Sequence, residues 1–563
     1  MTSYHALASQ LKERLASSEG SLVQVHMVHM VSAPIGAGLD IATRLSLELG
    51  GQFEVNLYAA CPVSVVKTLN SHLSGSGVAA LPGVYRVRVT ETVVLTLRVC
   101  NDASEGLGWL EDMPGKCDVA IVEGTGRLDC RWLVDSGWAG NECWLVEFPE
   151  ISVRKITISA NEAQGSFGGK LGPRTVMRSG DDVAVIGAGI AGMTLAHVLS
   201  AGGFKVTVID SVDPLSGQGT HSGHLAAALT PVVSADDNVR SRLSRAGALA
   251  ADRLWRNLSP EIGKRCGALQ LERLQGERRR VGLAQVADSF GYPEWAQWLD
   301  PVKASEIAGV RLDRAALWLP GGWLVKVESL IKELGAGIRV GFVQSFADRL
   351  IREAGLWKVV DGHGQVVSSA KAVIVANAGD STRLLANSGL LTDQSTVDSK
   401  VQRLSSMHRL AGEITAIPAN LLHGGPNCIV GGDGYVLPAV DGWCISGGTY
   451  VRGTVDAHTT EQGKRGNVER AASLLAMPEL PDVLGPSSRV FQQLPGWSGW
   501  RAVVAGRLPV VGPVGDADGV YVSTAGASRG LTWSVLMAEL IRDHLQGRFP
   551  ALEHDLLRAI SWA

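Results

Sequence analysis

One stretch constrains the fold more than any other: residues 183–210, VAVIGAGIAGMTLAHVLSAGGFKVTVID. A short apolar run, typical of a parallel strand buried on both faces, leads directly into the glycine pattern G-x-G-x-x-G. The residues after this pattern have the character of a helix, and a second apolar run then ends at Asp210. Strand, glycine turn, helix, strand and terminal acid are the parts of a dinucleotide-binding unit, in the order that such a unit needs.

Each glycine of the pattern has its own physical task in such a unit. Gly187 makes the tight turn, Gly189 lets the backbone approach a pyrophosphate, and Gly192 lets the helix pack closely against the strand. The helix N-terminus then faces the phosphate charge, and Asp210 can accept hydrogen bonds from a ribose hydroxyl group. The pattern therefore predicts a bound dinucleotide. The alternative is a structural glycine turn without a ligand.

Length and composition bound the rest of the chain. Its 563 residues are enough for more than one domain, and a hydrophobic fraction of 45% with a charged fraction of 19% is typical of a globular protein. The net charge of −3 is no global basic signal, so binding of nucleic acid would need a local patch. The eight cysteines form no C-x-x-C pattern and no histidines stand at ligand spacing, so we expect no metal site and reduced thiols.

The N-terminus and the apolar runs predict where in the cell the protein is found. The N-terminus has no apolar core typical of a secretory signal, and no apolar run is long enough to span a bilayer. We therefore expect a cytoplasmic protein without membrane contact. Nothing in the sequence determines the oligomeric state.

Residues 1–180 precede the dinucleotide unit and alternate weakly between strand and helix. A glycine turn and an amphipathic helix at 32–51 are similar to the first loop of a Rossmann-like methyltransferase, which binds S-adenosylmethionine. Such folds place an acid at the end of the second strand, where this chain has Ala59 and Ala60. A site for S-adenosylmethionine and a glycine turn without a ligand therefore explain the stretch equally well. A hairpin is expected at 81–97.

Arginines recur through a helical stretch that follows the dinucleotide unit. They are Arg240, Arg242, Arg245, Arg253 and Arg256. Such a run is either a solvated helix face or a patch that binds an RNA backbone, and both interpretations stay open.

Several later stretches occur in an order known from one family: VIGAGIAGMTLA, SGHLAAALTPVVSADDN, PGGWLVKVESLIKEL, VIVANAGD, GDGYVLPAVDGWCISGGTY, GRLPVVGPV and ASRGLTWS. From Val183 to its end the chain resembles the FAD-dependent, glycine-oxidase-like fold. More closely, it resembles the oxidase half of the MnmC family, bifunctional enzymes of the tRNA wobble uridine. Residues 1–180 resemble the methyltransferase half of that family in GVYRVRVTETVVLTLRVCNDASEGL, DVAIVEG and GSFGGK.

The resemblance implies an α/β protein with two domains. A Rossmann-like, methyltransferase-type domain would occupy 1–180, and an FAD-dependent oxidoreductase domain with a β-rich substrate subdomain would occupy 181–563. The FAD-binding parts would be 181–240, 340–400 and 500–563, and the substrate or cap parts 241–339 and 401–499. The implied FAD-binding residues are Gly187, Gly189, Gly192, Asp210, Ser222, Gly223, Ala378, Gly526, Ser528, Gly530 and Leu531.

The implied reaction removes the carboxymethyl group of 5-carboxymethylaminomethyl-uridine, or of its 2-thio form, at the wobble position of tRNA. Chemically this is the oxidation of an N-substituted glycine, for which a cation must hold the carboxylate while the methylene lies near the flavin. By resemblance we assign Arg501 and Arg529 to the carboxylate and Tyr435 to the substrate. The alternatives are a structural ion pair for each arginine and strand packing for the tyrosine.

The chain departs from the family in its first half. The family has Asp-Gly-Phe-x-Pro after the DVAIVEG strand, whereas this chain continues Glu123-Gly124-Thr125-Gly126-Arg127. We therefore expect the methyltransferase-like domain to keep its fold but to have lost methyl transfer. Two other functions compete with the tRNA oxidase: oxidation of free glycine or sarcosine, and a non-catalytic, flavin-containing RNA-binding module.

Overall fold

The computed structural model describes seven strands between Val23 and Thr157, and residues 176–560 apart from 217, 273–279, 291–294, 337–339, 392–398, 452–456, 516 and 549. The expected glycine turn and helix at 32–51 lie outside the described residues. The chain divides into two compact units, Met1–Val176 with Asp543–Leu557 and Met177–Arg542 with Arg558–Ala563.

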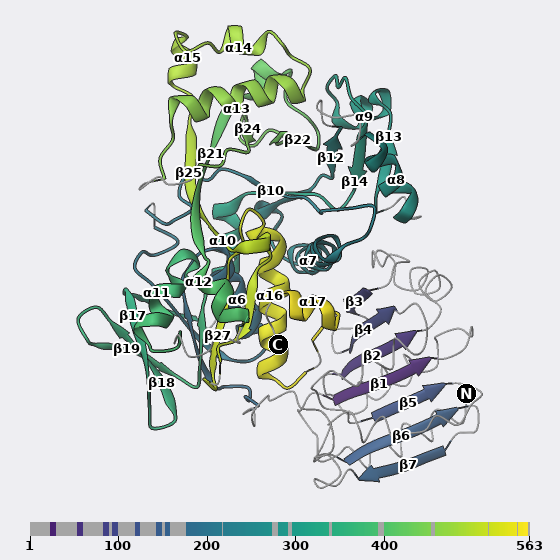
Figure 1. Ribbon diagram of the computed structural model, residues 1–563, viewed down its shortest axis with the longest axis vertical. Coiled ribbons are helices and arrows are strands. Elements are labelled where there is room, and N and C mark those ends of the chain that lie inside the picture. The colour runs from purple at the N-terminus through teal and green to yellow at the C-terminus, as the bar shows by residue number, and fades with distance from the viewer. Residues whose placement is uncertain are drawn as a thin grey trace. The chain divides into compact units, whose positions relative to one another are not determined.

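The first unit contains a seven-stranded sheet in the order β3-β4-β2-β1-β5-β6-β7. Its strands are β1 Val23–His29, β2 Phe53–Ala59, β3 Gly83–Arg88, β4 Val93–Val99, β5 Val119–Glu123, β6 Glu142–Phe148 and β7 Ser152–Thr157. Strands β4, β2, β1, β5 and β6 are parallel, and β3 and β7 pair antiparallel at the two edges. The expected hairpin is confirmed as β3 and β4. The first strand lies in the middle with later strands on both sides, which is the order of a doubly wound sheet (Figure 1).

The second unit is built on a six-stranded sheet in the order β16-β9-β8-β20-β27-β26. Its strands are β8 Asp182–Ile186, β9 Lys205–Asp210, β16 Val340–Gln344, β20 Ala372–Val375, β26 Val510–Pro513 and β27 Val520–Thr524. All are parallel except β26, and β20 and β27 are buried along their whole length. Helix α6, Ile190–Ala201, connects β8 to β9 and packs against α10, Val327–Gly335. The dinucleotide-binding unit predicted at 183–210 is therefore present at the centre of this sheet.

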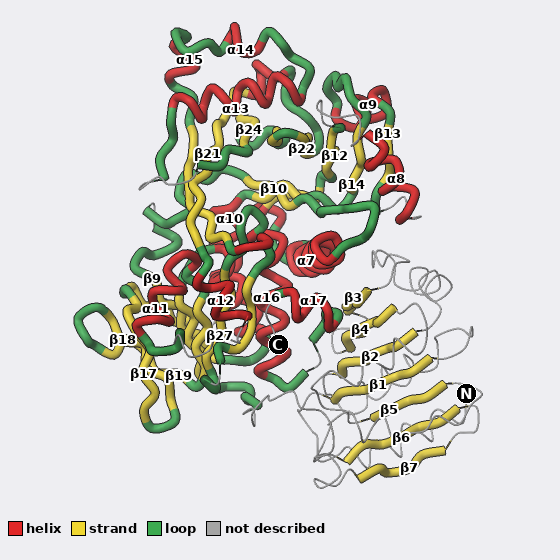
Figure 2. The backbone as a smooth tube through the Cα atoms, in the orientation of Figure 1, coloured by secondary structure: helices red, strands yellow, loops and turns green. Residues whose placement is uncertain are grey.

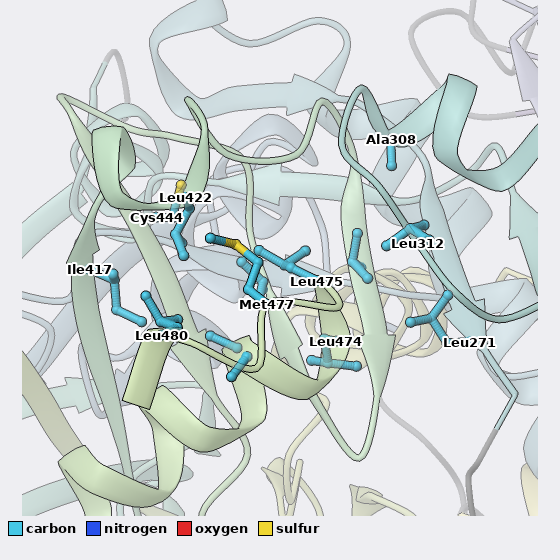
Figure 3. Close-up of a cluster of buried hydrophobic side chains, with 14 of the residues drawn as sticks. Leu271, Ala308, Leu312, Ile417, Leu422, Cys444, Leu474, Leu475, Met477 and Leu480 are labelled. Atoms are coloured by element: carbon cyan, nitrogen blue, oxygen red, sulfur yellow. The ribbon is translucent and has the colours of Figure 1, made fainter. Parts of the chain in front are cut away.

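An eight-stranded sheet follows the order β13-β14-β12-β22-β23-β24-β21-β25. Its strands are β12 Ala268–Leu271, β13 Gln297–Leu299, β14 Ala316–Leu319, β21 His408–Pro418, β22 Ile429–Gly432, β23 Gly434–Val436, β24 Trp443–Gly447 and β25 Gly496–Val503. Helix α13, Glu461–Leu474, packs on β21, β23 and β24 (Figure 1). Figure 3 shows Leu474, Leu475 and Met477 gathered with Leu422 and Cys444 in the apolar core on this face.

Strand alternation leaves the other face of this sheet free for a site. Successive side chains of a strand point to opposite faces, so Val436 lies in the core under α13 while its neighbour Tyr435 lines a cavity. The boundary expected at residue 500 falls inside β25, which continues to Val503 as one strand. We propose that the substrate subdomain ends after Val503.

A three-stranded sheet, β10-β15-β11, lies in the same unit, with β10 Ala227–Leu229, β11 Gly263–Arg265 and β15 Trp323–Val325. Helix α7, Val239–Trp255, approaches α16, Gly530–Leu545, very closely, because a Cβ added at Gly247 would lie 2.3 Å from the carbonyl oxygen of Thr532. A glycine is thus required where these helices meet.

Figure 2 shows the remaining elements, of which α8 contributes Gly282, Leu283 and Val286 to a cavity. They are β17 Ala347–Glu353, β18 Leu356–Asp361, β19 Val366–Ala370, α8 Arg280–Phe290, α9 Pro301–Ala308, α11 Ser381–Asn387, α12 Ser399–Ser405, α14 Leu480–Val483, α15 Arg489–Gln492 and α17 His554–Ala559. In the described part of the chain, none of the helices combines the length and apolar character of a membrane span.

Candidate active site

The glycine turn after β8 has the geometry that a dinucleotide needs. Gly187 has φ +106°, and a Cβ there would lie 2.7 Å from the carbonyl oxygen of Ala376. A Cβ on Gly192 would lie only 1.8 Å from the carbonyl oxygen of Gly187, so the helix could not pack there with any other residue. At Gly189 a Cβ would meet nothing within 4 Å. The two outer glycines are therefore fixed by packing, whereas the middle one borders open space where a ligand can approach the backbone.

Asp210 ends β9 and holds the turn in place. Its Oδ2 accepts a hydrogen bond from the backbone N–H of Ala188 at 2.6 Å, and its Oδ1 accepts one from Val212 at 3.2 Å. Each carboxylate oxygen can accept more than one hydrogen bond, so these bonds leave capacity for a ribose hydroxyl. Its contact with a ribose stays a prediction.

A cavity of about 1300 Å³ extends from the N-terminus of α6 to the N-terminus of α16 and along the eight-stranded sheet. The structure brings nine of the predicted residues to its wall: Gly189, Ala378, Tyr435, Arg501, Gly526, Ser528, Arg529, Gly530 and Leu531. The other predicted residues lie outside the lining: Gly187, Gly192, Asp210, Ser222 and Gly223. Of these, Gly223 donates its N–H to Glu328 Oε1 of α10 at 2.6 Å, which anchors the loop beside the cavity.

A second turn faces the cavity where α16 begins. Ala525 and Ala527 have φ of +58° and +49°, and the neighbouring Ala378, whose carbonyl oxygen accepts a hydrogen bond from Thr524 Oγ1 at 3.0 Å, has φ +50°. This left-handed conformation costs a non-glycine residue about 1–2 kcal/mol. Such strain is typical of functional sites. Gly530 opens α16 with no acidic residue in its first turn, so the unsatisfied N–H groups of that turn and the positive helix end favour a negatively charged ligand.

Arg501 and Arg529 both line the cavity and share one feature. Among the residues that the structure describes, no carboxylate lies within 4.0 Å of either guanidinium. Arg529 donates from Nη1 to the carbonyl oxygen of Thr230 at 3.0 Å, and Arg501 donates from Nη1 to that of Thr449 at 3.3 Å. Burial lowers the pKa of Arg529 to about 10, which still leaves it charged at neutral pH.

Tyr450 lies close to both of these cations. The Arg501 guanidinium carbon is 4.8 Å from the centroid of the Tyr450 ring, and the Tyr450 phenol acts on the pKa of Arg529 in the direction that favours its charge. Two partly or fully buried cations without a carboxylate are costly unless an anion joins them. This arrangement therefore favours a ligand that carries a carboxylate.

Tyr435 contributes a neutral hydrogen-bond donor to the same wall. Burial raises the pKa of its phenol, although the charge of Arg501 acts in the opposite direction. The ring lies so close to Gly447 that a Cβ there would be 2.6 Å from the phenol oxygen. The hydroxyl therefore stays protonated at neutral pH and is fixed in position.

Three aromatic residues without a predicted role also line the cavity: His221, His224 and Trp497. His224 stacks on Trp497 with a ring-centroid distance of 3.9 Å, and His221 Nδ1 lies 3.3 Å from His224 Nδ1. Burial lowers the pKa of His221 to about 4, and burial with the nearby charges of His221 and Arg501 lowers that of His224 to about 3. Both imidazoles are neutral at pH 7. Two histidines three residues apart beside the cofactor loop were the signal that could have indicated them.

These histidines predict a specific acid sensitivity. In the unfolded chain they take up protons as the pH falls below 6.5, whereas in the folded protein they stay neutral until about pH 4 or lower. Stability is therefore complete above pH 6.5 and decreases as the pH falls, by about 2–3 kcal/mol per histidine at pH 4.5. The free energy of unfolding is measured with urea above pH 6.5 and at pH 4.5. Between these two conditions it should decrease less for the His221→Asn/His224→Asn variant than for the natural protein. An equal loss would mean that the histidines are solvated.

The arginine run of α7 is mostly a structural surface. Arg245 pairs with Asp237 at 2.9 Å. Arg253 pairs with Glu539 at 2.6 Å and Arg256 with Asp252 at 2.8 Å. Arg240 lines the cavity.

Comparison with known proteins identifies the family. The family model described as FAD dependent oxidoreductase matches residues 182–544, which include both glycine turns and the whole cavity wall.

The chain belongs to the family of FAD-dependent oxidoreductases.

Curated relatives resemble the same part of this oxidoreductase. The tRNA 5-methylaminomethyl-2-thiouridine biosynthesis bifunctional protein MnmC of Cupriavidus metallidurans is 32% identical over 412 residues, 67% of this chain and 57% of that protein. The protein of the same name from Paraburkholderia phytofirmans is 31% identical over 409 residues, 67% of this chain and 58% of its own length. The chain thus matches less than two thirds of the length of these relatives.

Solved structures share the fold of the oxidoreductase. Glycine oxidase from Geobacillus kaustophilus superposes with a TM-score of 0.54 at 21% identity, covering 69% of this chain and 99% of that protein. Glycine oxidase from Bacillus cereus has a TM-score of 0.52 at 19% identity, with coverage of 65% and 95%. At this identity the likeness shows the fold.

The residues of the cavity fit FAD, the cofactor of this family. The open backbone at Gly189 and the N-terminus of α6 can take the pyrophosphate, because no side chain or acid occupies that space. The turn before α16 can take the negative charge of a reduced flavin. Among the described residues, no group of three or more histidine, cysteine or acidic side chains is arranged to hold a metal ion.

Proposed function

We propose that this oxidoreductase removes the carboxymethyl group of 5-carboxymethylaminomethyl-uridine, or its 2-thio form, at the tRNA wobble position. The observation that carries the proposal is the pair Arg501 and Arg529 in the cavity that begins at the open glycine turn, two cations for which the described part of the chain supplies no carboxylate partner. An N-substituted glycine supplies the missing carboxylate, which is bonded directly to the reacting methylene carbon. The MnmC relatives support the assignment by their name, over the part of their length that the chain matches.

The residues of the cavity have separate tasks in this reaction. Arg501 and Arg529 hold the substrate carboxylate through charge-assisted hydrogen bonds, and the protonated phenol of Tyr435 donates a further one. FAD, when bound, would supply the two-electron oxidant for the methylene group of the substrate. The resulting substrate imine adds water and divides into glyoxylate and the 5-aminomethyl base, so the C–N bond breaks after oxidation.

The state of the substrate amine is also set by the cavity. Hydride leaves readily only when the nitrogen is neutral, and a protonated amine would lie near two guanidinium groups. The imidazoles of His221 and His224 are neutral and therefore add no charge. Solvent is sufficient to remove the amine proton, and no residue need act as a general base.

The nucleosides of cellular tRNA test the proposal. Cells that lack this protein should accumulate the 5-carboxymethylaminomethyl nucleoside, and the 5-aminomethyl or 5-methylaminomethyl nucleoside should return when the gene is restored. Expression of the Arg501→Ala/Arg529→Ala variant in these cells should restore neither of the two product nucleosides. Identical nucleoside profiles with and without the protein would exclude a role in this modification.

We further propose that the first unit no longer transfers methyl groups. The parallel pairing of β1 with β2 and β5 aligns Ala59 and Glu123 with His29 at one edge of the sheet, so an alanine ends the strand where a ribose-binding acid is expected. Isothermal titration with S-adenosylmethionine should give no measurable heat of binding at micromolar protein concentration. Binding with micromolar affinity would show that the cofactor site is intact.

A further inference from the structure

The mouth of the cavity presents two large aromatic side chains to solvent. Tyr450 is 53% exposed and Trp500 is 38% exposed, and both contribute to the cavity wall. Both side chains belong to segments next to β21. Trp500 of β25 pairs with Ala411 of β21, and Val451, the neighbour of Tyr450, forms a β-bridge with Ala411 on the other side. Exposed rings next to a polar site are the usual platform for a planar ligand, because a base can stack on them without any loss of packing in the free protein.

Two exposed arginines belong to the wall of the same cavity. Arg240 at the start of α7 and Arg507 both line the cavity, and Arg240 Nη2 donates to the carbonyl oxygen of Gly506 at 3.0 Å, across 266 residues of sequence. Within the described part of the chain neither has a carboxylate within 4.0 Å. Arg507 has φ +57°, so its backbone adopts a strained conformation at this position.

The charges of the whole wall are strongly one-sided. Five arginines line the cavity, Arg240, Arg470, Arg501, Arg507 and Arg529, against the two acids Glu272 and Asp433. A glycine-sized substrate needs Arg501 and Arg529 but has no group that would reach the outer cations and rings.

We propose that the cavity mouth binds single-stranded RNA, with a base stacked on Tyr450 or Trp500 and a neighbouring phosphodiester held by Arg240 and Arg507. Aromatic platforms combined with unpaired arginines are how proteins bind unpaired nucleotides, which the anticodon loop offers. This inference rests on the proposed function, because it assigns how the RNA-linked substrate is held. From the arginine run the proposal takes Arg240, whereas Arg245, Arg253 and Arg256 are paired with acids.

Binding of a fluorescein-labelled anticodon stem-loop RNA tests the inference without any turnover. Fluorescence anisotropy of the FAD-loaded, full-length protein is measured over a series of salt concentrations. Each lost phosphate contact on single-stranded RNA lowers the slope of log K against log salt by about 0.7. Because both arginines hold one phosphodiester, the slope for Arg240→Ala/Arg507→Ala should be smaller by about 0.7, whereas the Arg240→Lys/Arg507→Lys variant should keep it.

A matched control and a second variant separate stacking from charge. Arg465, exposed on α13 and paired with Glu469, provides the control substitution Arg465→Ala, which should leave affinity and slope unchanged. Tyr450→Ala/Trp500→Ala, which removes both rings, should weaken binding about tenfold with an unchanged slope, because a stacked base carries no counterions. An unchanged slope in the double alanine variant, or an equal change in the Arg465 control, would overturn the proposal.

Turnover distinguishes failure of this inference from failure of the proposed function. On modified tRNA, kcat/KM of the double alanine variant should fall at least tenfold, while on the free 5-carboxymethylaminomethyl nucleoside it should stay within twofold. An equal fall on both substrates would assign the two arginines to the reaction centre. If the natural protein oxidises neither substrate, the proposed function is wrong, and the anisotropy slopes still decide whether the mouth binds RNA.

Discussion

Replacing Arg501 by alanine is expected to lower kcat/KM for the carboxymethylated tRNA roughly 100- to 1000-fold. Removing one partner of a buried, hydrogen-bonded charge pair costs about 2–5 kcal/mol, and each 1.4 kcal/mol corresponds to about a factor of ten. The side chain also lies 4.8 Å from the Tyr450 ring, so its loss frees that ring as well. Steady-state production of glyoxylate from modified tRNA measures the effect.

The conservative variant separates charge from geometry at this position. Arg501→Lys keeps the charge but loses the planar fork, so we expect an intermediate loss of about tenfold. Arg465→Ala is the control for removal of an arginine from the surface of the same unit. A kcat/KM within twofold of the natural protein for Arg501→Ala would show that the carboxylate binds elsewhere.

Alanine substitutions at two glycines of the same turn are expected to have opposite consequences. At Gly189 the added methyl group meets no atom within 4 Å, and the backbone, with φ −75° and ψ −173°, suits alanine. Gly189→Ala should therefore leave the apoprotein as stable as before, but it places a methyl group where the pyrophosphate approaches. FAD affinity should fall roughly 100-fold, as expected when a ligand loses close backbone contact.

At Gly192 the added methyl group would lie 1.8 Å from the carbonyl oxygen of Gly187, so the helix must move away from the turn. We expect Gly192→Ala to lower the melting temperature of the apoprotein by several degrees, because overpacking costs about 1–3 kcal/mol. Thermal unfolding of the apoproteins and fluorescence titration with FAD measure the two effects separately. An intact FAD affinity in Gly189→Ala would mean that the cofactor does not approach this turn.

The dinucleotide-binding unit could be predicted from the sequence because its determinants are local. The strand, the three glycines and Asp210 all lie within 28 consecutive residues, and the structure places them as strand β8, turn, helix α6 and strand β9. The hydrogen-bond partners of Asp210 could not be predicted from its position in the sequence. Its carboxylate accepts hydrogen bonds from the N–H groups of Ala188 and Val212, which depends on the three-dimensional path of the turn.

The composition of the cavity wall could not be predicted because it joins distant segments. Arg501 and Arg529 were assigned through family resemblance, whereas the stack of His221 and His224 on Trp497 arises only when β25 meets the loop after β9. Likewise, nothing in the arginine run of α7 distinguishes Arg240 from its neighbours. The difference comes from the acids that pair with the others and from the Gly506 carbonyl that holds Arg240 at the mouth.

The most direct measurement of the central claim is anaerobic mixing of the FAD-loaded protein with tRNA that carries 5-carboxymethylaminomethyl-uridine at the wobble position. The account predicts loss of the oxidised-flavin absorbance near 450 nm, with one glyoxylate and one 5-aminomethyl nucleoside formed per flavin reduced. Free glycine at the same concentration should leave the absorbance unchanged. Bleaching by free glycine with none by the modified tRNA, or a protein that stays colourless when given FAD, would contradict the account.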